Sequence, residues 1–201
     1  EGEREFYDDV YGNIWVRMVG GCAKGEIHQP VLEDWAQLDS LGMPQYDHKT
    51  MVRNFHTGFG NNPDDKFKLA HIGGWIFDNA RYLRKMEVYC MDMALYPAEL
   101  KRLHRLIGDV YEQKIRAAGE AGADGIMIGE DMGTQQGLLF SPAMFREFFK
   151  PDYTRLMGIA HGYGMKILMH SCGNNWEIVD DLIDCGVDCF QFDQPAVYDM
   201  E

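Results

Sequence analysis

The chain has 201 residues, 46% of them hydrophobic and 25% charged, and a formal net charge of −13. This composition is ordinary for a globular protein with one substantial core or two small ones. The excess of acidic residues argues against a nucleic-acid partner, because phosphates require a basic surface. No apolar run approaches the roughly 18 residues of a membrane span, and the acidic first residues do not resemble a secretory signal.

The cysteines predict a reducing compartment. They lie at no regular spacing, which favours free thiols in a cytoplasmic protein over a disulfide framework. The five are Cys22, Cys90, Cys172, Cys185 and Cys189. Cys185 and Cys189 flank a glycine between a predicted helix end and a strand, so we expect both in the core.

Residues 1–66 are predicted to form an N-terminal region of a hairpin, a short helix and a surface loop. Aromatic and β-branched residues alternate loosely around Gly12, which predicts a β-hairpin over residues 7–20. A short helix is expected within residues 26–41, with Pro30 at its start. Residues 42–66 are rich in Gly, Pro, Asn and Asp, so they are predicted to be a surface excursion.

Residues 67–201 alternate predicted strands and helices. The strands are expected at 67–72, 124–129, 166–170 and 188–192, and the helices at 76–86, 97–121, 142–163 with a break at Pro151, and 174–185. The last helix begins at Asn174, which has capping-box spacing to Glu177. Residues 121–128 and 185–192 repeat one order: a glycine, a small apolar residue, an aspartate and a strand. This alternation predicts a parallel sheet built from βα units.

Polar side chains follow three successive strands of this region. They are Glu130 and Asp131, His170 and Cys172, and Asp193 and Gln194. Polar groups that converge at the carboxyl ends of parallel strands are typical of the active face of a (β/α)₈ barrel. Only four or five strands can be counted, so we expect a barrel fragment whose open edges are covered by missing segments or by a homo-oligomer.

His170 and Cys172 are the strongest candidate ligands. Residues two apart on a strand point to the same face, so an imidazole and a thiol would project together where the strand ends. The pair is half of a plausible zinc site, although two ligands are too few for zinc, and the alternative is a buried histidine beside an inert cysteine. Glu130, Asp131 and Gln135 suit acid–base, metal or substrate contacts, or a solvated loop, and Asp193 and Gln194 carry the same ambiguity.

The other histidines are expected to be structural. His71 lies within a predicted strand and is interpreted as a core residue with satisfied hydrogen bonds. The remaining five show no partner pattern and are interpreted as surface residues: His28, His48, His56, His104 and His161.

Several motifs together resemble the uroporphyrinogen decarboxylase superfamily. They are residues 122–135, Ser141-Pro142 through Phe145, Phe149-Lys150-Pro151 and His170-Ser171-Cys172-Gly173-Asn174. The resemblance is specific from about Lys68 to Gln194, and it is closest to the branch with a His-x-Cys motif. It implies a (β/α)₈ barrel and one of two activities. One branch decarboxylates uroporphyrinogen in porphyrin biosynthesis, and the other transfers methyl groups between a corrinoid protein and a thiol such as coenzyme M.

The resemblance to the methyltransferase branch implies that His170 and Cys172 are zinc ligands. The family's further cysteine ligand lies beyond the end of this chain, and the Arg-rich motif and early Asp of the decarboxylases have no match. Glu130 and Asp131 are expected to be the catalytic carboxylates, and Gln135, Asp193 and Gln194 the substrate contacts. The leading hypothesis is zinc-dependent methyl transfer. The alternatives are tetrapyrrole decarboxylation and a non-catalytic barrel fragment that binds a corrinoid protein or a small molecule.

Overall fold

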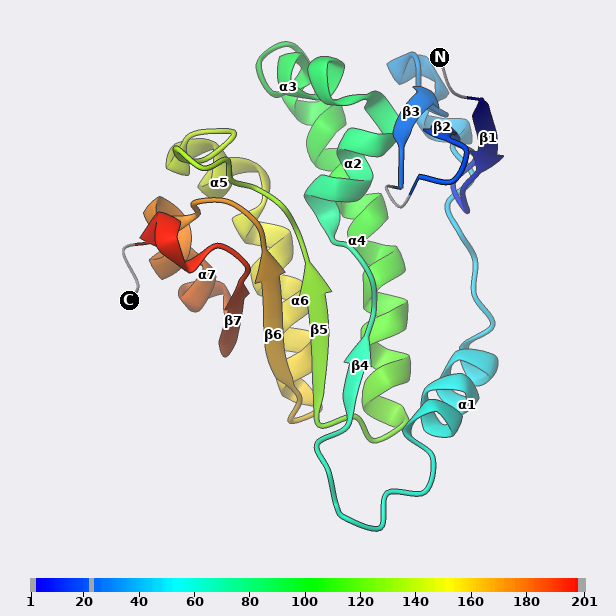
Figure 1. Cartoon of the computed structure of the whole chain (residues 1–201), viewed down its shortest axis with the longest axis vertical. Coiled ribbons are helices and arrows are strands. Elements are labelled where there is room, and N and C mark those ends of the chain that lie inside the picture. Colours follow the sequence, from blue (N-terminus) through cyan, green and yellow to red (C-terminus); the bar gives the residue numbers. More distant parts are fainter. Residues whose placement is uncertain (1–2, 22–23, 199–201) are drawn as a thin grey trace.

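The computed structural model of the chain describes residues 3–21 and 24–198, so the expectation for Cys22 lies outside the described residues. The centre of the molecule is a parallel sheet of four strands in the order β4-β5-β6-β7, open at both edges (Figure 1). Its strands are β4 (Leu69–His71), β5 (Gly125–Gly129), β6 (Lys166–Ser171) and β7 (Cys189–Phe192). The predicted α/β class and its parallel sheet are therefore confirmed.

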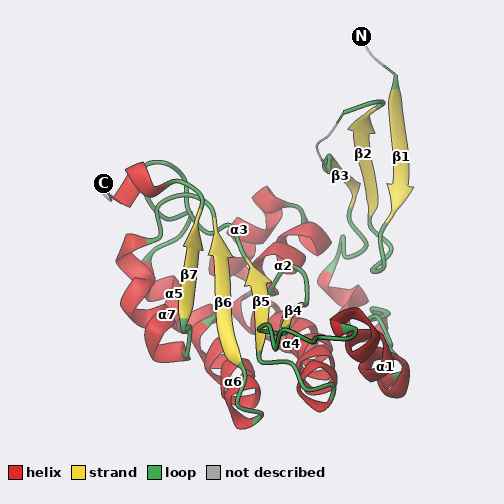
Figure 2. Ribbon diagram, turned by 60° about the horizontal axis from the view of Figure 1, so that its bottom comes forward, coloured by secondary structure: helices red, strands yellow, loops and turns green. Residues whose placement is uncertain are grey.

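Helices connect these strands and cover one face of the sheet (Figure 2). They are α2 (Ile76–Arg84), α3 (Met86–Leu95), α4 (Pro97–Glu120), α5 (Pro142–Phe148), α6 (Lys150–Gly162) and α7 (Val179–Cys185). In the described part of the chain, no helix is both long enough and apolar enough to cross a membrane.

The two faces of the sheet differ in burial with the period of two that strands impose. The covered face is formed by side chains that pack against the helices, and these are buried: Ala70, Ile126, Ile128, Ile167, Met169 and Ser171. The open face is formed by side chains that are half-buried or exposed: His71, Met127, Gly129, Leu168 and His170. One-sided cover of this kind is expected for part of a barrel, whose interior face carries no helices.

The repeated Gly-x-Asp sequence explains how the strands are held in register. Asp124 Oδ2 accepts a hydrogen bond from the N–H of Lys68 (2.7 Å), and Asp188 Oδ2 accepts one from the N–H of Ile167 (2.9 Å). Each aspartate thus binds the start of the neighbouring strand. The preceding glycines, Gly122 (φ +78°) and Gly186 (φ +117°), end the helix in a conformation that side chains disfavour.

The N-terminal region contains a second sheet. Strands β1 (Arg4–Asp8), β2 (Ile14–Met18) and β3 (Glu26–Gln29) pair antiparallel, so the predicted hairpin is confirmed and a third strand is added. The helix expected within 26–41 is a 3₁₀ helix, η1 (Trp35–Ser40), and Asp34 rather than Pro30 begins it, since the Asp34 side chain caps the N–H of Ala36. The prediction of Pro30 at the helix start was wrong because residues 26–29 complete the sheet.

Residues 42–66 lie at the surface, as predicted, but they include a regular helix where a loop was expected. Helix α1 (His48–Phe59) begins where Asp47 caps the N–H of Thr50 (2.8 Å) and ends at Gly60 (φ +57°). Its apolar stripe of Met51, Phe55 and Phe59 contacts the molecule from one side only, and none of its residues is fully buried.

Two other element boundaries differ from the predictions, and one agrees. Helix α3 was not predicted; it follows α2 after a sharp turn at Lys85, whose φ is +63°. The helix break expected at Pro151 is confirmed, with α6 beginning one residue earlier. The Asn174 capping box is not formed, because Asn174 Oδ1 accepts from the N–H of Trp176 and a 3₁₀ turn, η2 (Trp176–Ile178), precedes α7.

Two histidines and one cysteine lie in environments opposite to those predicted. His71 is on the open face and exposed, whereas His104 is fully buried between Tyr89 Oη (3.0 Å) and the carbonyl oxygen of Phe148 (2.9 Å). Cys185 is buried as predicted, but Cys189 is exposed. The errors for His71 and Cys189 share one cause: the interior face of the sheet is uncovered in this chain.

The N-terminal region and the parallel sheet share one core. Leu32 and Leu38 belong to the same buried cluster as the strands. The guanidinium of Arg84 joins the two parts, since it donates to the carbonyl oxygen of Leu32 (2.7 Å) and pairs with Asp92 (2.8 Å).

Candidate metal centre

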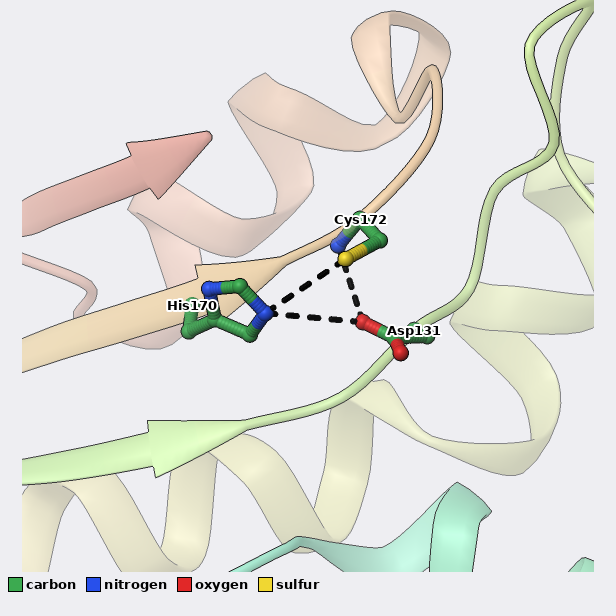
Figure 3. Close-up of side chains that lie close together, drawn as sticks. All are labelled: Asp131, His170 and Cys172. Carbon is green, nitrogen blue, oxygen red and sulfur yellow. Dashed lines mark hydrogen bonds and ion pairs between the residues drawn. The ribbon is translucent and has the colours of Figure 1, made fainter. Parts of the chain in front are cut away.

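Three side chains with metal-binding atoms meet at the carboxyl ends of β5 and β6 (Figure 3). They are Asp131, which follows β5, and His170 and Cys172 at the end of β6. His170 Nε2 lies 3.5 Å from Cys172 Sγ and 3.8 Å from Asp131 Oδ1. One donor atom from each residue lies within 4.8 Å of the other two, and all three side chains are half-buried. His170 and Cys172 therefore project side by side, as the sequence predicts.

The alternation of the strands places these three groups on one side. The open face carries residues 127, 129 and 131, which lie in and just after β5. It also carries residues 168, 170 and 172, which lie in and just after β6. Ser171 points to the covered side, where its hydroxyl donates to the carbonyl oxygen of Glu130 (2.6 Å). The N–H of Cys172 donates to Asp131 Oδ1 (2.9 Å), which fixes this carboxylate beside the thiol.

The loops after the two strands are clamped together just beyond the site. The N–H of Asn174 donates to the carbonyl oxygen of Thr134 (2.7 Å). At Gly173 (φ +75°) a Cβ would lie only 2.2 Å from the backbone of Gly133. Only glycine fits at such an approach, so the Cys-Gly-Asn sequence after the strand brings Asp131 and Cys172 together.

Asp193 lies on the other side of the His170 ring. Its Oδ1 is 3.8 Å from His170 Nδ1, and its Oδ2 is 4.0 Å from Cys172 Sγ. The nitrogen next to Asp193 is the one that does not face Asp131 and Cys172. A carboxylate at this position favours the tautomer that leaves Nε2 free for a cation.

The electrostatics of the centre favour a cation. Burial, together with the carboxylates of Asp131 and Asp193, raises the pKa of the Cys172 thiol to about 11. Two carboxylates, an imidazole and a thiol form a donor set with an excess of negative charge, and the nearby Arg81 is paired with Asp78. A positive ion among them would relieve this repulsion and stabilise the thiolate.

The distances suit zinc. Zinc bonds to nitrogen, oxygen and sulfur are about 2.0–2.3 Å long, and tetrahedral angles then separate two ligand atoms by about 3.4–3.6 Å. The observed 3.5 Å between His170 Nε2 and Cys172 Sγ and 3.8 Å between Nε2 and Asp131 Oδ1 are close to these values. The residues present therefore fit a zinc ion with three protein ligands and an open position.

Glu130 does not share this centre with Asp131, which differs from the sequence-based expectation. Consecutive strand residues point to opposite faces, so Glu130 continues the covered face and is only 1% exposed. Its Oε1 accepts from the N–H of Asp78 (2.9 Å) at the start of α2, and Oε2 has no partner among the described residues. Burial, and next the charge of Asp78, raises the pKa of Glu130 well above its ordinary value.

The two glutamines lie outside the centre. Gln135 is exposed in the loop after β5, between the bridged residues Gly133 and Leu138. Gln194 is half-buried next to Asp193, and its Oε1 is buried without a hydrogen-bond partner in the described part of the chain.

The structure adds residues that the sequence reasoning missed. A pocket of about 250 Å³ adjoins the centre and is lined by Asp131 and His170, by His71, and by Asp78 on the first turn of α2. The Nε and Nη2 groups of the Arg81 guanidinium both donate to Asp78 Oδ1 (2.8 and 2.6 Å). Burial raises the pKa of Asp78, against the opposing effect of Arg81. The rule that polar groups gather where strands end could have found Asp78, since it follows the first strand of the parallel sheet.

Comparison with known proteins identifies the family. A sequence model of the family described as uroporphyrinogen decarboxylase (URO-D) matches residues 16–200. The chain belongs to the uroporphyrinogen decarboxylase family. No curated protein matches the sequence.

Among solved structures, a methyltransferase from Methanosarcina mazei shares the fold of this family member, with a TM-score of 0.67 at 18% sequence identity. The match covers 84% of this chain and 49% of the methyltransferase, so the chain spans about half the length of that structure. The four-stranded sheet with helices on one face is therefore consistent with part of a (β/α)₈ barrel.

Proposed function

We propose that the protein is a zinc-dependent methyltransferase that moves a methyl group between a corrinoid, carried by a partner protein, and a small thiol. The observation that carries this proposal is the group of Asp131, His170 and Cys172 at one sheet edge, with spacings that suit zinc. The family and the methyltransferase of similar fold support it.

Each residue of the centre has a distinct role in the proposal. His170 and Cys172 are zinc ligands held by one strand end, and Asp131 supplies an oxygen ligand from the neighbouring strand. Asp193 orients the His170 ring through Nδ1. Gln194, next to Asp193, is proposed to contact the substrate, and Gln135 to reach it from the exposed loop. Bound zinc would lower the pKa of a substrate thiol, so that the nucleophilic thiolate forms at neutral pH.

The open face of the sheet, on which the centre lies, leaves room for a methyl donor to approach. Asp131, His170 and Cys172 are half-buried, and they lie on the open face of the sheet. A methylated corrinoid would supply the methyl group without its bonding electrons, and the thiolate held at this centre would accept it. A substrate sulfur bound to zinc would be held by ligands at the rigid ends of β5 and β6. This favours the transfer, because two reactants in a fixed alignment react far faster than free ones.

Glu130 is proposed to position the centre rather than to touch substrate. Its Oε1 accepts a hydrogen bond from the N–H of Asp78 in α2, and its carbonyl oxygen accepts one from the Ser171 hydroxyl, so it links β5 to α2 and to β6.

The pocket makes decarboxylation of a tetrapyrrole the weaker alternative. A substrate with several carboxylates needs basic side chains, but the residues that line the pocket in the described part of the chain include no lysine or arginine. Arg81, which lies nearby, is paired with Asp78.

The proposal is tested by methyl transfer from methylcobalamin to a thiol, followed by the change in corrinoid absorbance. We expect the zinc-loaded chain to accelerate the reaction and Cys172→Ser to lower the rate at least about a hundredfold. Asp180→Asn, which removes an exposed carboxylate from α7, is the matched control and should leave the rate unchanged. Metal-independent turnover of a uroporphyrinogen, or full activity of Cys172→Ser, would refute the proposal.

A further inference from the structure

The pocket beside the candidate metal centre has an unusual wall. Asp131 and His170 line it, together with Asp78 from the first turn of α2. Gly73 and Gly74, between β4 and α2, also line the pocket and add no side chains to it. At about 250 Å³, the pocket is large enough for a molecule of a few heavy atoms.

Asp78 is held in place with one oxygen left over. Arg81 donates twice to Oδ1, and no hydrogen bond to Oδ2 occurs among the described residues. The Asp78 side chain is 15% exposed, so Oδ2 is available to a ligand in the pocket.

The charges around the pocket are mostly negative. The lining residues in the described part of the chain include the carboxylates of Asp78 and Asp131 but no lysine or arginine, and Arg81 pairs with Asp78 from outside the lining. A zinc ion would be balanced by the Cys172 thiolate and Asp131, so Asp193 and an incoming substrate thiolate would make the filled centre negative. A second negative group on the substrate would be repelled, and a positive one attracted.

We infer that the thiol substrate carries an ammonium group, which the Asp78 carboxylate binds while the sulfur occupies the metal. This inference rests on the proposed function and names the chemical class of its substrate: a small aminothiol rather than a thiol with a sulfonate, such as coenzyme M. Asp78 is then the residue that determines specificity, and Arg81 holds it in position.

Three thiols with the same two-carbon chain between the sulfur and a second polar group test the inference. The chain is loaded with Co²⁺ as a spectroscopic substitute for zinc. The thiols are 2-aminoethanethiol, 2-mercaptoethanol and 2-mercaptoethanesulfonate, and the thiolate-to-Co²⁺ absorption reports the dissociation constant of each. We expect 2-aminoethanethiol to bind most tightly and the sulfonate most weakly, with about tenfold between successive thiols.

Variants separate the contribution of Asp78 from the intrinsic acidity of each thiol. Asp78→Asn should weaken 2-aminoethanethiol about tenfold and change 2-mercaptoethanol less than about twofold. Asp78→Glu keeps the charge and should keep the preference, and Asp180→Asn should change nothing. Co²⁺ binding by each variant confirms that the centre is folded.

The outcomes for the two proposals are distinct. Equal loss of all three thiols in Asp78→Asn, or tightest binding of the sulfonate by the unaltered chain, overturns the inference and leaves the metal centre standing. Failure of the unaltered chain to bind Co²⁺ overturns the proposed function itself.

Discussion

The covered and open faces of the parallel sheet use similar side chains for different purposes. Glu130 and Asp131 are consecutive carboxylates at the end of β5, yet Glu130 is buried against α2 and Asp131 lies beside His170 and Cys172. The histidines show the same contrast, since His104 is buried in the helical layer and His170 stands on the open face. Residue type at a strand end therefore does not decide a role. The face of the strand decides it.

The largest effect expected from this contrast is on the open face. Cys172→Ser replaces a thiolate with a poor zinc ligand and should weaken zinc binding about a thousandfold or more, with the free energy of unfolding changed by less than about 1 kcal/mol. Competition with a chelator measures the affinity. Cys189→Ser, an exposed thiol of the neighbouring strand, is the control and should leave affinity unchanged. Comparable losses in both variants would contradict a site at Cys172.

On the covered face, the expected loss is in stability instead. Glu130→Ala leaves the N–H of Asp78 without its buried acceptor and should lower the free energy of unfolding by about 2–3 kcal/mol, measured by urea unfolding. Glu130→Gln keeps the accepting oxygen and should cost less than about 1 kcal/mol. Zinc affinity should change less than about threefold in either variant; a loss like that of Cys172→Ser would place Glu130 in the metal centre after all.

The buried imidazole predicts a loss of stability in acid. Burial lowers the pKa of His104 to about 4, below its ordinary value of 6.5. Stability from the neutral ring is thus fully present above pH 6.5 and is lost as pH falls toward 4, by about 2 kcal/mol at pH 5. Urea unfolding at pH 8 and pH 5 measures the difference. His104→Phe should remove this part of the pH dependence and His170→Ala should retain it; the opposite pattern would assign it to the open face.

A smaller effect is expected at the edge of the open face. Asp193→Asn removes the charge next to His170 Nδ1 while keeping the size of the side chain, and should weaken zinc binding about tenfold. The measurement is the same chelator competition. A loss as large as that of Cys172→Ser would show that Asp193 is itself a ligand, and no loss would show that its position 3.8 Å from the ring is incidental.

The features that the sequence predicts correctly are those that local patterns determine. The Gly-x-Asp repeats located the starts of two strands, because Asp124 and Asp188 bind the neighbouring strands through their own side chains. The His-x-Cys pattern placed both groups on one face, as strand geometry requires. The same alternation also predicts the face on which Glu130 lies. Ile126 and Ile128 are apolar, so Glu130, two residues further on, belongs to the covered face.

Other features depend on contacts that no local pattern records. The metal group needs Asp131 next to Cys172, and this depends on the close approach of Gly133 and Gly173 from two separate loops. Asp78 reaches the pocket only because α2 begins beside β5. Helix α1 was missed because its capping residue, Asp47, lies within a Gly- and Pro-rich segment whose composition resembles a loop.

The most direct test of the account is the zinc content of the purified chain and of Cys172→Ser, measured by elemental analysis after equilibration with zinc and removal of unbound metal. We expect one zinc ion per unaltered chain. We expect none in Cys172→Ser, with the fold of that variant retained by circular dichroism. Zinc that persists in Cys172→Ser, or an unaltered chain that binds none, would contradict it.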